Sequence, residues 1–310
     1  NLTEKINDRR CNILNKKKLE KEIISFKPHF IFHLAAQSLV NKSLKLPHTT
    51  WETNVIGTIN ILECLRKIEH KCVGVIITSD KCYENKEILR GYKEDDELGG
   101  VDPYSASKGS AELAIRSYIK SYFSSNKSKV RIAIGRAGNV IGGGDWSEDR
   151  ILPDCVKSWS KNKKVVLRNP ESTRPWQHVL EPLSGYLILA KNLNQNTSLH
   201  GEAFNFGPRE NVSRTVIQLV KEMSLYWENV QWDIRPNKKL IESKLLKLNC
   251  KKSKKILGWE SNLNFQQTIR FTAEWYKKYY KDKVNAEKIS KMQIIEFTKL
   301  ARANSLNWAK

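Results

Sequence analysis

The sequence predicts an α/β fold built around a doubly wound parallel sheet. Short apolar runs of strand length alternate with stretches whose apolar residues recur at helical spacing. Small or polar residues follow these runs directly, and a glycine-rich turn over 135–146 follows the third run. Strands and helices that alternate in this way form parallel sheets joined by right-handed crossovers. With 310 residues, the chain is long enough to bury a substantial core.

The predicted elements follow one another along the chain. Apolar runs rich in β-branched or aromatic residues predict buried strands at 30–32, 73–77, 130–134 and 203–206. Four further segments are predicted as helices, at 48–69, 103–122, 181–192 and 215–227. The residues after 283 are rich in charge and helix formers, which predicts a peripheral helix there.

The chain does not divide at a clean linker, so we expect two interleaved domains. The sheet domain is predicted to take residues 1–142 and to resume over about 181–207. A smaller α/β substrate domain would take about 143–180 and about 208–282, and 283–310 would form a helical tail. No internal repeat or low-complexity segment is present.

The strongest candidates for catalysis follow the second strand and begin the next helix. Thr-Ser-Asp-Lys at 78–81 follows that strand directly, at the carboxyl edge where α/β proteins place their sites. Tyr104 and Lys108 are four residues apart and therefore share one face of a helix. An adjacent ammonium favours a phenolate, so we expect Lys108 to lower the pKa of Tyr104 and make it a general base. In isolation this spacing is equally typical of an exposed aromatic beside a surface lysine.

The first strand and the third strand are both followed by segments suited to close approach of a ligand. His-Leu-Ala-Ala-Gln at 33–37 follows the first strand, and its small Ala35 and Ala36 would let a cofactor approach the backbone. The glycines of 135–146, after the third strand, would likewise let a ligand approach the backbone closely.

Six motifs in order resemble the extended short-chain dehydrogenase/reductase family, over essentially the whole chain. They are H-L-A-A-Q (33–37), E-T-N-V-I-G-T (52–58), T-S-D-K-C-Y-E-N (78–85), D-P-Y-S-A-S-K (102–108), R-A-G-N-V-I-G-G-G-D-W (136–146) and R-P-W-Q-H-V-L-E (174–181). The resemblance implies a Rossmann-like domain with bound NAD and a nucleotide sugar as substrate. Within the family, Asp80 followed by Lys81 resembles the 4,6-dehydratases of CDP-glucose, because those of dTDP-glucose usually have Asp-Glu there.

The resemblance implies a lyase reaction with specific residue roles. Tyr104 would take the proton of the sugar 4-hydroxyl, Ser79 would hydrogen-bond near that oxygen, and Asp80 and Lys81 would be the acid and base of water loss. An ion pair at a strand end is the alternative interpretation of Asp80 and Lys81. Eight residues are expected to bind NAD: Leu34, Ala35, Ala36, Gln37, Asn54, Thr78, Tyr104 and Lys108. Six are expected to bind CDP-glucose or a similar nucleotide sugar: Asn139, Arg150, Arg168, Arg174, Gln177 and His178.

Two expectations concern individual charged residues. A pyrophosphate could be bound through paired hydrogen bonds by any of three arginines, Arg150, Arg168 and Arg174. Alternatively, each of them forms an ion pair at the surface. Glu112 and Lys120 on the helix of Tyr104 are expected to face solvent.

A glycine-rich turn that would hold the cofactor pyrophosphate is absent before residue 30. We therefore expect the nucleotide-binding fold to lack roughly 50 to 60 N-terminal residues. Asn12 also stands where the family commonly has an aspartate near the adenine. The sheet edge and apolar faces left open would then favour aggregation or a partner. Two alternatives follow: another nucleotide-sugar enzyme, namely a 4-epimerase or a dTDP- or GDP-sugar dehydratase, and an inactive remnant or basic binding protein.

Composition excludes several other classes of protein. The net charge of +21 comes from 54 basic and 33 acidic residues, but the lysines are scattered and no nucleic-acid module is present, so a solvated basic surface is favoured over nucleic-acid binding. We expect no membrane-spanning segment and no signal peptide, because no apolar segment of the chain is long enough to span a membrane. Six cysteines without metal-ligand spacing predict reduced thiols, no metal site and a cytoplasmic protein. The resemblance implies a homodimer through the helices at 48–69 and 103–122, and a role in deoxysugar biosynthesis such as that of lipopolysaccharide O-antigen.

Overall fold

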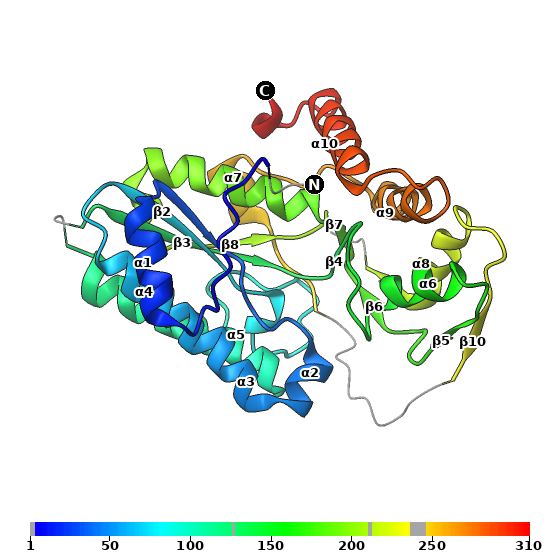
Figure 1. Cartoon of the computed structure of the whole chain (residues 1–310), viewed down its shortest axis with the longest axis horizontal. Helices are drawn as coiled ribbons and strands as arrows, with labels where there is room; N and C mark the ends of the chain where they lie inside the picture. The colour runs from blue at the N-terminus through cyan, green and yellow to red at the C-terminus, as the bar shows by residue number, and fades with distance from the viewer. Residues whose placement is uncertain (1–3, 126–127, 210–212, 236–245) are drawn as a thin grey trace.

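A parallel four-stranded sheet forms the centre of the larger half of the protein (Figure 1). The computed structural model describes residues 4–125, 128–209, 213–235 and 246–310. The strands are β1 (Phe30–His33), β2 (Cys72–Ile77), β3 (Val130–Ala137) and β8 (Ala203–Phe206), in the spatial order β1-β2-β3-β8. All four predicted strands are confirmed, and β3 continues three residues beyond its predicted end.

Alternate residues of each central strand face opposite layers of helices. In β2, Cys72 and Ile76 belong to one apolar cluster, whereas Val73 and Val75 belong to another. The first cluster packs against α1 (Lys16–Phe26), α4 (Gly57–Arg66) and α5 (Pro103–Tyr118). The second packs against α7 (Leu180–Gln195) on the other face, which is the doubly wound arrangement that was predicted.

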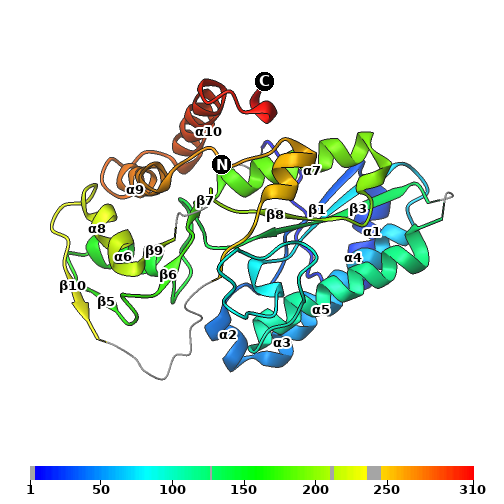
Figure 2. The ribbon, with the colours of Figure 1, turned by 180° about the vertical axis from the view of Figure 1, so that it is seen from behind.

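Two predicted helices contain π-helical turns. The helix expected at 48–69 consists of α3 (Pro47–Trp51), a π turn (Glu52–Ile56) and α4. The helix expected at 103–122 consists of α5 and a π turn (Ile119–Phe123). Seen from behind, α3 and the short α2 (Val40–Lys45) lie beside the N-terminal part of α5 (Figure 2). Sequence analysis did not predict α1 or α2, because their apolar positions are few.

The smaller half packs around a second apolar core. It contains α6 (Ile151–Trp159), α8 (Val216–Ser224), α9 (Phe265–Tyr280) and the parallel pair of β5 (Val165–Leu167) and β10 (Trp232–Ile234). Two further strand pairs lie near the junction of the halves, β4 (Val140–Ile141) with β7 (Gln177–His178), and β6 (Thr173–Arg174) with β9 (Arg214–Thr215). The tail forms α10 (Ala286–Ala303), which packs on α9. Positions 210–212 and 236–245 of the predicted substrate domain lie outside the described residues.

Strand β1 forms one edge of the described sheet. Phe30, Phe32 and Leu34 are 45%, 36% and 50% exposed. An edge strand with exposed apolar side chains is a site of association.

Candidate active site

The turn after β2 places two charged side chains at the carboxyl edge of the sheet. Ser79 caps a short 3-10 turn (Asp80–Cys82), and its hydroxyl lies 2.9 Å from Asp80 Oδ1. Lys81 Nζ lies 3.4 Å from the same oxygen. The carboxyl of Asp80 is buried, whereas Lys81 is partly exposed. The structure therefore contains the ion pair that was the alternative interpretation, in a position that also suits acid–base chemistry.

Asn139 approaches Asp80 from the turn after β3. Its Nδ2 donates a 2.9 Å hydrogen bond to Asp80 Oδ2. The Asn139 backbone has φ of 52°, a left-handed conformation that asparagine tolerates better than most residues. A Cβ on Gly138 would lie 1.9 Å from the Asp80 carboxyl, so the close approach requires glycine. Asn139 thus orients Asp80, and its contact with the substrate stays a prediction.

The other two catalytic candidates lie in the first two turns of α5. Asp102 caps this helix by accepting hydrogen bonds of 3.0 Å from the backbone N–H groups of Tyr104 and Ser105. Tyr104 and Lys108 are both buried, and the hydroxyl of Tyr104 hydrogen-bonds Ser79. Two chain segments are therefore brought together, with Tyr104 meeting the residues after β2.

The predicted lowering of the Tyr104 pKa is wrong for this structure. Burial has the largest effect and raises the pKa of Tyr104 to about 12, although the hydrogen bond from Ser79 acts in the opposite direction. Burial also lowers the pKa of Lys108 to about 8, because it disfavours the ammonium. Spacing along a helix predicted that the two groups are neighbours, but it contained no information on their desolvation.

The expectation that Glu112 faces solvent is also wrong. Glu112 lies one turn beyond Lys108 and is fully buried in an ion pair with Arg136 of β3. Its Oε1 accepts from Arg136 Nε at 2.7 Å and from Thr78 Oγ1 at 2.6 Å. Burial opposes ionisation of both groups, but Arg136 lowers the pKa of Glu112 and Glu112 raises the pKa of Arg136. Lys120 is exposed, as expected.

The loop after β1 is fixed to α5 through one buried asparagine. Asn54 accepts from the Gln37 backbone N–H at 2.8 Å and donates to the Gln37 carbonyl at 3.0 Å. Its Nδ2 also donates to Ser107 Oγ at 2.9 Å. Ala35 is exposed and Ala36 is half-buried, which leaves the backbone of this loop accessible.

These residues fit the reactive end of a dinucleotide cofactor. Within the described chain, the Lys108 ammonium makes one hydrogen bond, a long one of 3.5 Å to the Ile77 carbonyl. An ammonium has three donors, so two remain for a ligand such as a ribose hydroxyl. Leu34 is half exposed, whereas Thr78 is buried and directs its hydroxyl to Glu112. The cofactor roles of the loop, Asn54 and Thr78 stay predictions.

The three arginines expected at the phosphates have different surroundings. Arg150 pairs with Asp145 at 3.0 Å and reaches Ser38 Oγ at 3.3 Å. Arg168 pairs with Asp149 at 2.9 Å. Arg174 lies in β6 and donates to the Thr173 carbonyl at 2.8 Å.

Gln177 and His178 of β7 lie inside the protein. Gln177 Nε2 donates to the carbonyls of Gly138 and Phe206, at 3.0 and 2.9 Å, and so joins the ends of β3 and β8. The His178 ring packs edge-on against Phe271, and burial lowers its pKa to about 3. Both residues are buried parts of the scaffold that joins the two halves, and their predicted contacts with the substrate stay predictions.

Two kinds of site are not found in the part of the chain that the structure describes. No group of three or more histidine, cysteine, aspartate or glutamate side chains is arranged to hold a metal ion there. Within the same ranges, no helix combines the length and apolar character needed to cross a membrane.

Comparisons with known proteins find relatives of this chain over most of its length. A protein-family profile described as GDP-mannose 4,6 dehydratase matches residues 1–272. The CDP-glucose 4,6-dehydratase of Salmonella typhimurium is 43% identical over 264 residues, which cover 84% of this chain and 74% of that protein. The UDP-glucose 4-epimerase of Mycoplasma genitalium is 23% identical over 289 residues, covering 88% of this chain and 82% of that protein.

Solved structures share the fold at lower identity. The UDP-glucose 4-epimerase of Thermotoga maritima with UDP-glucose superimposes with a TM-score of 0.73 at 22% identity, covering 87% of this chain and 84% of that one. The dTDP-glucose 4,6-dehydratase of Bacillus anthracis in complex with NAD gives a TM-score of 0.69 at 24% identity, covering 87% of this chain and 79% of that one. The Rossmann-like fold expected from the sequence is thereby confirmed.

Proposed function

Because the chain belongs to the GDP-mannose 4,6-dehydratase family, we propose that it converts CDP-glucose to CDP-4-keto-6-deoxyglucose in an NAD-dependent reaction. The observation that carries this proposal is the meeting of the Asp80–Lys81 pair with Tyr104 at the carboxyl edge of the sheet. The identity of 43% to a CDP-glucose 4,6-dehydratase supports the choice of nucleotide sugar.

The first step is oxidation at C4 of the glucose. Tyr104 takes the proton of the 4-hydroxyl as that carbon becomes a ketone, and Ser79 hydrogen-bonds the Tyr104 hydroxyl. NAD, when bound, supplies the acceptor and later the donor of the hydride, and its positively charged ring favours the phenolate of Tyr104. Lys108 has two further N–H donors, which can hydrogen-bond a ribose hydroxyl of the cofactor.

The second step is loss of water between C5 and C6. The new ketone acidifies the C5 hydrogen. Once the proton of the Asp80–Lys81 ion pair has passed from Lys81 to Asp80, the neutral Lys81 can take the C5 proton while Asp80 gives its proton to the departing 6-hydroxyl. The hydride held by NAD would then return to C6 and Lys81 would give its proton back to C5, which would yield the 4-keto-6-deoxy sugar. Asn139 and Gly138 keep Asp80 in place for this proton transfer.

A 4-epimerase is the second candidate, because epimerases of about 23% identity share the fold. Epimerisation needs Tyr104 and Lys108 but leaves Asp80 and Lys81 without a chemical role. The mass of the product separates the two reactions, since only dehydration removes water.

The test is a turnover assay on the purified chain with CDP-glucose and NAD+, which follows the alkali-induced absorbance of the 4-keto-6-deoxy sugar. Replacing Tyr104→Phe or Lys81→Ala should lower kcat by roughly 10²- to 10⁴-fold, the usual contribution of a general acid or base. Tyr279→Phe and Lys71→Ala alter exposed residues outside the site and outside the proposed dimer segments, and should leave kcat unchanged. Product with an unchanged mass, or full turnover in both active-site variants, would refute the proposal.

We also propose that two copies associate through the helical segments 47–66 and 103–123. Four apolar or aromatic side chains there are exposed, Trp51, Ile56, Leu113 and Tyr122. Light scattering coupled to gel filtration should give a dimer that Leu113→Glu dissociates, and a wild-type monomer would contradict this.

We further propose a location and a pathway. All six cysteines are free thiols, which supports the cytoplasm as the location. The proposed product, a 4-keto-6-deoxy sugar nucleotide, supports a role in deoxysugar biosynthesis such as that of O-antigen.

A further inference from the structure

The loop before α6 in the smaller half contacts the segment after β1 in the larger half. Its last residue, Arg150, donates from Nη1 to Asp145 Oδ2 at 3.0 Å and from Nη2 to Ser38 Oγ at 3.3 Å. Asp149, beside it, accepts a hydrogen bond from the side chain of Asn41 in the first turn of α2. Arg150 and its neighbour therefore bridge the two halves of the protein.

The end of this bridge in the smaller half is held by α9. The hydroxyl of Tyr276 accepts from the Asp145 backbone N–H at 3.1 Å and donates to the Asp145 carbonyl at 2.7 Å. Tyr276 is fully buried, and the ring of Trp275 packs against the backbone of Gly143, where a Cβ would lie 2.0 Å from that ring. Asp145 is thus a fixed partner for Arg150.

The other end of the bridge leads to the helix of the catalytic tyrosine. Ser38 precedes α2 closely, and Ser43 of α2 accepts from the Tyr104 backbone N–H at 3.2 Å. Ser43 is fully buried there, since α2 packs on the N-terminal part of α5 (Figure 2). A shift of Ser38 would therefore be transmitted through α2 to the first turn of α5, which carries Tyr104.

The charge of Arg150 also acts on Tyr104. Burial has the largest effect and raises the pKa of Tyr104 to about 12, whereas the positive charge of Arg150 acts in the opposite direction. Ser79 lowers the same pKa, and Asp80 and Cys82 raise it. The titratable groups that face Tyr104 from other elements are Asp80 and Cys82 after β2, Arg150 before α6 and Tyr186 of α7, and Lys108 lies one turn along its own helix. Arg150 thus offsets part of the effect of burial.

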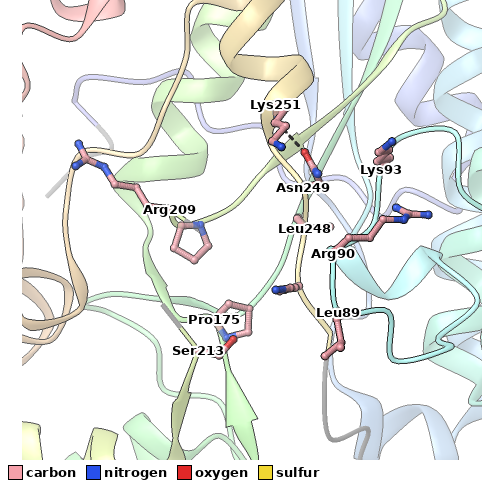
Figure 3. Close-up of a pocket in the computed structure, with 11 residues that line it drawn as sticks. Leu89, Arg90, Lys93, Pro175, Arg209, Ser213, Leu248, Asn249 and Lys251 are labelled. Carbon is pink, nitrogen blue, oxygen red and sulfur yellow. Dashed lines mark hydrogen bonds between the residues drawn. The ribbon is translucent and has the colours of Figure 1, made fainter. Parts of the chain in front are cut away.

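Other cations near the junction of the halves have a different position. Lys93 and Arg209 line a cavity of about 450 Å³ beside Pro175 (Figure 3). Arg150 is not among the described residues that line this cavity, and it contacts the segment after β1 instead. An anion bound to Arg150 would also compete with the carboxylate of Asp145. These observations favour a role toward Tyr104 over the direct binding of an anion.

We propose that Arg150 is a positioning residue of the active site, which joins the two halves at Ser38 and places its positive charge where it favours the ionised form of Tyr104. The inference rests on the proposed function, since it assumes that Tyr104 is the base of that reaction. It gives Arg150 a role within the protein in place of the pyrophosphate contact expected from the sequence. Arg150 acts through Tyr104, so its loss should slow the reaction without abolishing it.

The kinetic test compares the pH dependence of kcat in the wild-type protein, Arg150→Gln and Arg150→Lys. Without the charge, the phenolate of Tyr104 is less favoured, so the acid limb of the profile should move to higher pH by roughly half a unit in Arg150→Gln. On that limb kcat should fall roughly threefold, and it should recover as the pH rises. Arg150→Lys retains the charge and should restore the wild-type profile. The control Arg270→Gln breaks an ion pair with Glu296 within the smaller half and should leave the profile unchanged.

A second measurement tests the bridge without turnover. Hydrogen exchange of the α2 amides, followed by mass spectrometry, should be at least about threefold faster in Arg150→Gln, because the hydrogen bond that anchors Ser38 is lost. Ser38→Ala removes the same hydrogen bond and should have the same effect. Arg270→Gln should not change this exchange.

Each outcome of these experiments bears on the proposal. An equal fall of kcat at every pH would overturn it, and so would a raised KM with an unchanged kcat, because Arg150 would then bind the substrate. Unchanged exchange in Ser38→Ala would overturn the bridge, even if Arg150→Gln fails to fold. An unchanged thermal midpoint shows that a variant is folded. Failure of the proposed function would appear separately, as absence of product from the wild-type protein, while the exchange measurement would still report on the bridge.

Discussion

Replacing Glu112→Gln should destabilise the sheet domain strongly, because it leaves a buried guanidinium without its charge partner. The side chains of Glu112 and Arg136 are both fully buried. The Glu112 carboxylate accepts hydrogen bonds from Arg136 through both of its oxygens. Glutamine has only one oxygen, so its NH₂ group would face one of the Arg136 N–H donors. The oxygen that remains must also serve Thr78, which donates to Glu112 at 2.6 Å.

The magnitude follows from the cost of breaking a buried pair. Removing one partner of such a pair costs about 3–5 kcal/mol, since the other charge remains in a medium that solvates it poorly. Typical domains have a free energy of unfolding of about 5–15 kcal/mol, so this is a large fraction of the total. Exposed pairs behave differently, and Glu97→Gln, which breaks the pair with Lys86 at the surface, should leave the unfolding midpoint unchanged.

The assay is guanidinium chloride unfolding followed by far-ultraviolet circular dichroism. The double variant Glu112→Leu/Arg136→Met removes both charges and should recover much of the loss, because apolar side chains of similar volume often replace a buried pair without cost. A loss below about 1 kcal/mol in Glu112→Gln would refute the reasoning, as that is the range of exposed pairs. A double variant less stable than Glu112→Gln would show that the network around Arg136, rather than its charge, requires the arginine.

Three further predictions test single features of the site and sheet. Burial lowers the pKa of Lys108 from 10.5 to about 8, so between these pH values the unfolded state binds more protons and the free energy of unfolding should rise with pH. Lys108→Met should abolish that rise. The free energies of unfolding of the wild-type protein and the variant, measured as a function of pH, should therefore change relative to each other by about 3 kcal/mol over this range, and a constant difference would contradict the prediction. Gly138→Ala should displace the Asp80 carboxyl, with its Cβ at 1.9 Å, and lower kcat while the fold measured by circular dichroism persists; full turnover would show that Asp80 tolerates the shift. Phe30→Lys and Phe32→Lys should reduce association beyond the proposed dimer, measured by light scattering, because they place charge on the exposed edge strand β1. A wild-type protein that stays a monodisperse dimer at high concentration would contradict this.

The strands and the catalytic segment could be predicted because their signals are local. An apolar run such as 73–77 identifies a buried strand by itself, and its direction places the next residues at the carboxyl edge of the sheet. Tyr104 and Lys108 share a helix face through their spacing alone. These inferences needed no contact between distant segments.

The errors concern properties that depend on contacts between distant segments. Glu112 was expected to face solvent, since nothing in its helix indicates Arg136 of β3, 24 residues away. The Tyr104 pKa was expected to fall, but its direction depends on burial from several elements. Tyr92 and the segment 247–249 also lie far apart in the sequence, and nothing in either segment predicts that their backbones pair.

A buried network connects the catalytic helix to the segment around Asn249. Arg136 pairs with Glu112 on α5 and donates to the Tyr83 hydroxyl at 2.6 Å. That hydroxyl donates to Asn205 Oδ1 at 2.8 Å, and Asn205 Nδ2 in turn donates to the carbonyl of Asn249. Loss of the Glu112 charge should therefore affect two places at once, the position of Thr78 before the catalytic turn and the backbone around Asn249. Because Thr78 directly precedes the catalytic turn, the Glu112→Gln variant should lower kcat as well as stability, whereas full turnover in the destabilised variant would show that the turn keeps its position without this hydrogen bond.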